Sequence, residues 1–137
     1  MNTQDTSGNF YPRIESVLDS FGHTFQGGPG KGDQIAWCRT GFTLRVGQVV
    51  AFTCIALDPQ DRPLRIELVR GQLIEKADEA YTSGGQPVTL RWEVKKADVQ
   101  RDAIITVKLW TKDYEYHRHG NLGDAQVNFV YQVFPDS

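Results

Sequence analysis

The sequence predicts an all-β protein, an antiparallel β-sandwich of about seven strands that follows an N-terminal arm. From residue 35 onward, apolar side chains alternate with polar ones, as in strands that pack one face on a core. Turn-forming segments rich in Gly, Pro, Asn and Asp separate these runs. No long amphipathic helix accompanies them, so two packed sheets are favoured, with a single closed barrel as the alternative.

Six runs carry the alternation, and the clearest places Trp92 on a buried face between charged neighbours. One further segment, Leu73–Tyr81, fits either a strand followed by a turn or a short helical turn. The six runs cover residues 42–46, 49–57, 64–68, 88–94, 105–109 and 125–133.

The composition shifts near residue 34, so we expect an N-terminal arm (residues 1–34) and a sandwich domain (residues 35–137). Between Pro12 and Gly22, apolar residues recur at helical spacing, which predicts a short helix with proline first and glycine after its end. The apolar residues at this spacing are Ile14, Val17, Leu18 and Phe21. The Gly-rich stretch that follows lacks the spacing of a phosphate-binding loop, which predicts a flexible loop.

Charge and hydropathy limit the classes of partner. The 137 residues carry a net charge of −2, which argues against nucleic-acid binding. No apolar run approaches the roughly 18 residues of a membrane span, so we expect no membrane insertion. The first residues have neither the basic nor the apolar region of a signal peptide, which favours the cytoplasm unless the chain is an excised domain.

The segment Ala56–Leu64, Ala-Leu-Asp-Pro-Gln-Asp-Arg-Pro-Leu, resembles the Asp-Pro-Asp-Gly-Asp-Pro-Leu turn of bacterial cadherin-like and PKD-like immunoglobulin-type domains. The resemblance extends in order over about residues 42–134 and implies an Ig-like β-sandwich. It also places Cys54 where immunoglobulin domains have their first disulfide cysteine. The partner strand offers no cysteine, so the inter-sheet disulfide of immunoglobulin domains is absent. Cys38 could pair with Cys54 only if the chain bends back and the compartment is oxidising; with no signal peptide, we expect two buried, reduced thiols.

In the related turns, several Asp side chains can hold calcium. Here Gln60 and Arg62 replace two of those acids, which leaves Asp58 and Asp61. Because calcium takes six to eight oxygen ligands, we favour a tight turn in which Asp58 caps its own backbone.

The segment Lys112–Gly120 joins the last two predicted strands and is rich in chemically active side chains. If it is extended, two acids and two histidines fall on one face, in a pattern suited to zinc or a similar ion. These candidate ligands are Asp113, Glu115, His117 and His119, with His117 and His119 forming the His-x-His pair. The alternative is a solvated loop.

The other face of the same segment suggests a recognition surface, since loops of a sandwich carry binding functions on a rigid scaffold. Its residues are Tyr114, Tyr116 and Arg118, to which Tyr81 could be added. Trp110 has the opposite parity to its apolar neighbours, so it is predicted to face outward and either contact a ligand or lie under the Gly-rich arm.

These observations favour a non-enzymatic interaction module that binds a protein partner or its own copy through end loops or an exposed sheet edge. A carbohydrate-binding module is the first alternative, and an exposed coplanar pair of aromatic rings would distinguish it. Metal binding or metal-dependent activity at residues 113–119 is the second. No Ser–His–Asp order, HExxH motif or phosphate loop indicates an enzyme, and no cofactor is predicted.

Overall fold

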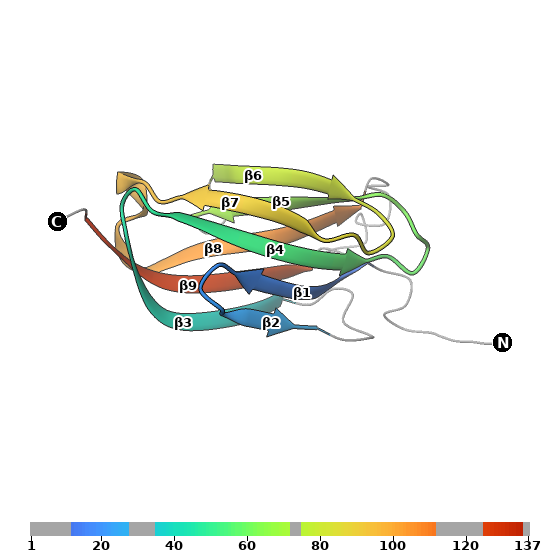
Figure 1. Cartoon of the computed structure of the whole chain (residues 1–137), viewed down its shortest axis with the longest axis horizontal. Coiled ribbons are helices and arrows are strands. Elements are labelled where there is room, and N and C mark those ends of the chain that lie inside the picture. The colour runs from blue at the N-terminus through green and yellow to red at the C-terminus, as the bar shows by residue number, and fades with distance from the viewer. Residues whose placement is uncertain (1–11, 28–34, 72–74, 112–124, 136–137) are drawn as a thin grey trace.

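The computed structural model describes residues 12–27, 35–71, 75–111 and 125–135, which form a β-sandwich of two packed sheets (Figure 1). Nine strands and one short 3₁₀ turn, Lys96–Asp98, are present in these residues. The strands are β1 (Arg13–Asp19), β2 (Thr24–Gln26), β3 (Ile35–Arg45), β4 (Val49–Leu57), β5 (Leu64–Arg70), β6 (Glu75–Thr82), β7 (Val88–Glu93), β8 (Gln100–Thr111) and β9 (Gln126–Phe134). No helix within the described ranges is long and apolar enough to cross a membrane.

One sheet has the order β2-β1-β4-β7 and the other the order β3-β9-β8-β5-β6. All described strand pairs are antiparallel except β3 and β9, which run parallel. This parallel pair departs from the purely antiparallel sheets that we predicted. It arises because β3 lies at the margin of the sandwich and joins the sheet opposite to that of β4, which follows it in the chain.

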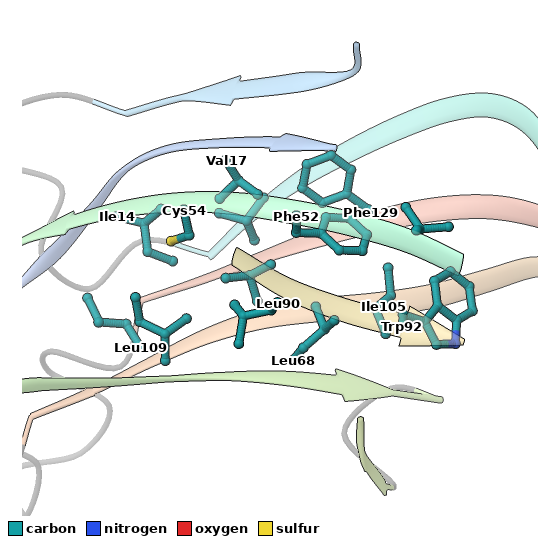
Figure 2. Packing of buried hydrophobic residues seen from close by; sticks show 14 of the residues in the cluster. Ile14, Val17, Phe52, Cys54, Leu68, Leu90, Trp92, Ile105, Leu109 and Phe129 are labelled. Carbon is teal, nitrogen blue, oxygen red and sulfur yellow. The ribbon is translucent and has the colours of Figure 1, made fainter. Parts of the chain in front are cut away.

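The core lies between the sheets, where each strand of the predicted sandwich turns its apolar side chains inward (Figure 2). The inward residues predicted for β4, β5, β7, β8 and β9 are confirmed, and Trp92 is only 1% exposed. On β8 and β9 the other face does not simply meet water as predicted, because Thr106, Asn128 and Val130 are buried too. Aromatic rings from both sheets meet at the centre. Phe52 of β4 packs edge-to-face on Phe129 of β9 with ring centroids 5.2 Å apart.

The predicted helix between residues 12 and 21 is wrong, because this segment contains strand β1, which pairs with β4. A β-bulge explains the misleading spacing. The register shifts between Ile14 and Ser16, so one extra residue separates Ile14 from Val17 and both side chains point into the core. In a regular strand, residues three apart would lie on opposite faces.

The N-terminal arm that we expected as an appendage therefore contributes part of the sandwich. Ile14 and Val17 are fully buried in the core, and β2 pairs with β1 to extend the same sheet. Together with β6, which occupies the ambiguous segment near residue 77, these two strands raise the total above the predicted seven.

Candidate functional site

The segment that carries most of our predicted site residues falls within residues 112–124, outside the described residues. The metal hypothesis and most of the recognition hypothesis therefore stay predictions. The residues concerned are Asp113, Tyr114, Glu115, Tyr116, His117, Arg118 and His119. Within the described ranges, no three His, Cys, Asp or Glu residues form a group that could hold a metal ion.

Two predicted binding residues, Trp110 and Tyr81, lie in one row across the five-stranded sheet. Arg65 on β5 is opposite Trp110 on β8 and opposite Tyr81 on β6, so it stands between the two aromatic residues. Tyr81 is strongly exposed, whereas Trp110 is half-buried. The register thus brings these two side chains to the same outer face of the sheet.

The ring of Trp110 is already engaged by charged neighbours. Its Nε1–H donates a hydrogen bond of 2.9 Å to Glu67. The guanidinium carbon of Arg65 lies 5.3 Å from the ring centroid, and Lys108 Nζ lies 4.5 Å from it. These cations compete with a sugar for the indole face, since both are held by the same π-electron density.

The third surface is the edge of strand β3 that faces away from β9, with which no described strand pairs. Cys38 Sγ on this strand lies 3.9 Å from the Thr24 carbonyl oxygen of β2, in the other sheet. Strand β3 pairs with β9 along one side and ends the strand order of its sheet. It has 11 residues, and its outward side chains include Ile35, 58% exposed, and Trp37, 49% exposed. Arg39 is also exposed, and its guanidinium carbon lies 5.4 Å from the centroid of the Trp37 ring. On an edge strand with exposed apolar side chains, the backbone N–H and C=O groups along the edge provide a template for pairing with another strand.

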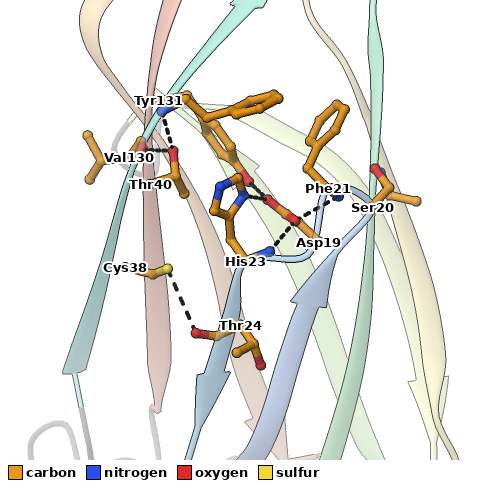
Figure 3. A network of polar contacts seen from close by, with 11 residues as sticks. Asp19, Ser20, Phe21, His23, Thr24, Cys38, Thr40, Val130 and Tyr131 are labelled. Carbon is orange, nitrogen blue, oxygen red and sulfur yellow. Dashed lines mark hydrogen bonds and ion pairs between the residues drawn. The ribbon is translucent and has the colours of Figure 1, made fainter.

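A buried polar cluster that sequence reasoning missed lies at the turn between β1 and β2 (Figure 3). Asp19 is 2% exposed, and its Oδ2 accepts hydrogen bonds from Tyr131 Oη at 2.6 Å and contacts His23 Nδ1 at 2.8 Å. Its Oδ1 accepts from the backbone N–H groups of Phe21 and His23. Asp19 and Tyr131 are 112 residues apart, so their meeting depends on the packing of the two sheets.

The hydrogen bonds decide the charge state of the Asp19 carboxyl. Burial alone would raise its pKa, but the donors Tyr131, His23 and Phe21 together outweigh that effect and hold the pKa below its ordinary value of 3.8. The pKa of Tyr131 is raised, first by burial and then by its hydrogen bond to Asp19. The cluster is thus an ionised carboxylate surrounded by donors, which is an arrangement that fixes structure.

Both cysteines are free thiols, as we predicted, but only Cys54 is fully buried, while Cys38 on β3 is half-buried. Burial raises the pKa of the Cys54 thiol to about 12. Burial, and then the negative charge of Asp19, also raises the pKa of Cys38. Because the thiolate is the nucleophilic form, neither environment activates a cysteine for catalysis.

The turn after β4 closes around Asp58. Its carboxylate accepts hydrogen bonds from the backbone N–H groups of Gln60 and Arg62. The Arg62 guanidinium also donates to both carboxylate oxygens, at 2.6 Å and 2.9 Å. This bidentate ion pair already occupies the oxygens that the calcium hypothesis requires, and Asp61 adopts a positive φ of 58° within the same turn.

Comparisons with known proteins give no family for this chain. No protein-family model matches it, and no curated protein matches it. Among solved structures, it is similar to the N-terminal domain of PorA, with 12% sequence identity over 84% of this chain and 96% of that one. The TM-score of 0.39 is too low for this likeness to support an argument about function.

Proposed function

We propose that this protein is a non-enzymatic interaction module that binds a protein partner, or a second copy of itself, through the free edge of β3. The observation that supports this proposal best is an edge strand whose first five residues, 35–39, keep a regular register with β9 and include the exposed side chains of Ile35 and Trp37. Backbone hydrogen bonds along such an edge provide affinity, and alternate side chains provide specificity.

The other three edges of the described sheets are each protected. Strand β2 has only three residues, which is too short for extended pairing. Strand β6 begins with the exposed charges Glu75 and Lys76. On β7, the outward backbone N–H of Arg91 donates a hydrogen bond of 2.8 Å to the carboxylate of Asp78. A free apolar edge is therefore a distinguishing property of β3 among the described strands.

The strand order supports an Ig-like framework for this module. Strands β1, β4 and β7 are neighbours in one sheet, as strands A, B and E are in immunoglobulin domains. Strands β5, β8 and β9 correspond in the same way to strands C, F and G. On this basis we propose an Ig-like module of the kind that the Ala56–Leu64 turn resembles.

Site-specific photocrosslinking tests the β3 edge directly. A photoreactive phenylalanine analogue would replace Ile35 in the full chain. This variant would be expressed in the organism that encodes the protein, so that natural partners are present. The matched control places the same group at Tyr81, which is 68% exposed on β6, the opposite edge strand of the same sheet. We expect position 35, and not position 81, to give one discrete protein adduct or a dimer.

A second substitution shows whether that adduct depends on the strand surface. Trp37→Lys should abolish the crosslink from position 35, since it removes the exposed apolar anchor beside it. Tyr81→Lys should leave it unchanged. Absence of an adduct from position 35, or an equal adduct from position 81, would refute the proposal.

A further inference from the structure

The exposed side chains of β3 have a consistent chemical character that restricts what can pair with them. Along Ile35–Arg45 the strand contains two arginines and no acidic residue. Arg45 is engaged at its end of the strand, because it donates to the Pro135 carbonyl and lies over the ring of Phe134. Arg39 stacks on Trp37, and within the described residues no carboxylate pairs with it. One cation beside two apolar side chains is therefore available to an incoming strand.

The straight part of this edge is short. The register with β9 shifts between Arg39 and Thr43, so the regular pairing of β3 is interrupted at residues 40–42. Gly41 has a positive φ of 63°. The hydroxyl of Thr40 accepts a hydrogen bond from the N–H of Phe42 and donates one to the Val130 carbonyl of the neighbouring strand β9. Because this register shift interrupts the regular ladder, continuous pairing is confined to about residues 35–39.

Cross-strand chemistry then selects the partner. Side chains directly opposite one another on a sheet face interact, and opposite charges or apolar pairs are favourable there. Ile35 and Trp37 favour apolar residues opposite them, and Arg39 favours a carboxylate. A second copy of β3 has no acid to offer Arg39, so self-pairing would leave this cation uncompensated.

We infer that the β3 edge binds an extended segment of another protein that carries two apolar residues and one acidic residue at every second position, on one face of the strand. This inference rests on the function proposed above and specifies its partner. The incoming strand would extend the five-stranded sheet at β3, with its carboxylate against Arg39 and its apolar side chains against Trp37 and Ile35.

Two synthetic peptides of equal length test the charge preference on the full, ¹⁵N-labelled chain. Both place Val at two successive positions of one strand face, with Thr at the positions between, and the next position of that face holds Glu in one peptide and Lys in the other. We expect the Glu peptide to shift the amide resonances of residues 35–39 and to bind more tightly than the Lys peptide. Arg39→Ala should weaken binding of the Glu peptide about fivefold, as expected for the loss of one cross-strand pair.

A charge reversal distinguishes recognition from a structural effect. Arg39→Glu should transfer the preference to the Lys peptide. The control Arg91→Glu changes an exposed arginine on β7, in the other sheet, and should leave both affinities unchanged. Equal binding of the two peptides, or no transfer of preference, would overturn the inference.

The remaining outcomes separate this inference from the proposed function. If light scattering shows a dimer that Trp37→Ser dissociates, a second copy of the protein binds the β3 edge. This result would refute the inferred acidic partner segment, but it would support the proposed function of the edge. If neither peptide shifts the β3 amides, the inference also fails. The edge function itself fails only when position 35 gives no specific crosslink.

Discussion

Tyr131 donates a hydrogen bond of 2.6 Å to Oδ2 of Asp19, and this bond joins the two sheets of the sandwich. Tyr131 lies on β9 of the five-stranded sheet, whereas Asp19 ends β1 of the four-stranded sheet. Both residues are at most 2% exposed. The same carboxylate holds the turn that leads to His23, so one buried group orders both a local turn and a contact between distant strands.

Replacing Tyr131 with phenylalanine tests the energetic value of this contact. The substitution keeps the ring but leaves a buried carboxylate oxygen with one donor fewer. We expect the free energy of unfolding to fall by about 1–3 kcal/mol, as measured by urea denaturation. Tyr81→Phe, at an exposed position, is the matched control and should change it by less than about 0.5 kcal/mol. Equal effects of the two substitutions would contradict a structural role for the bond.

The lowered pKa of Asp19 predicts a specific dependence of stability on pH. A carboxyl whose pKa is lower in the folded state stabilises the protein above its ordinary pKa of 3.8, and this contribution is lost as pH falls through the folded pKa. Asp19→Asn should therefore be less stable than the wild type at pH 7. The difference in the free energy of unfolding between the two proteins should narrow below about pH 4. Denaturation curves collected at successive pH values measure this difference, and a difference of constant size would contradict the prediction.

The position of β1 in the sandwich can be tested by truncating one buried and one exposed side chain of the same strand. Ile14 is fully buried, whereas Leu18 is 47% exposed. Ile14→Ala should reduce the free energy of unfolding by about 3 kcal/mol, because it removes buried methyl groups and leaves a cavity. Leu18→Ala should cost less than about 1 kcal/mol. Similar small losses for both variants would mean that the segment is an appendage.

The two thiols should differ in reactivity. Cys38 is half-buried, whereas Cys54 is fully buried and has a pKa raised to about 12. Under native conditions at pH 8, a thiol reagent should modify Cys38 slowly and Cys54 only after unfolding. Mass spectrometry of the wild type and of Cys38→Ser reports each site. Rapid modification of native Cys38→Ser would contradict the burial of Cys54.

Much of the sandwich was predictable because apolar and polar side chains alternate along its strands. Trp92 and its neighbours on β7 show why this works, since each inward residue is apolar and each outward residue is polar. The same logic failed for β1. Its bulge between Ile14 and Ser16 gives two inward residues three positions apart, and that spacing is also the mark of a helix.

The candidate surfaces were less accessible to sequence reasoning. The alternation along its own strand predicts that Trp110 faces outward. Its contacts with Arg65 and Glu67, however, come from a neighbouring strand about 43 residues away in the sequence. The free edge of β3 could not be predicted either. Whether a strand lies at an edge depends on which strands pair with it, and pairing is a property of the assembled sheet.

The sequence by itself determined the fold class, because alternation of side chains is a local property that survives without knowledge of partners. It also determined the turn at Asp58, since the groups that this carboxylate binds lie within four residues of it. Only the tertiary structure decided that the first strand belongs to the core, that Asp19 meets Tyr131, and that β3 ends its sheet. Each of these depends on contacts between segments far apart in the chain, which local residue patterns do not encode.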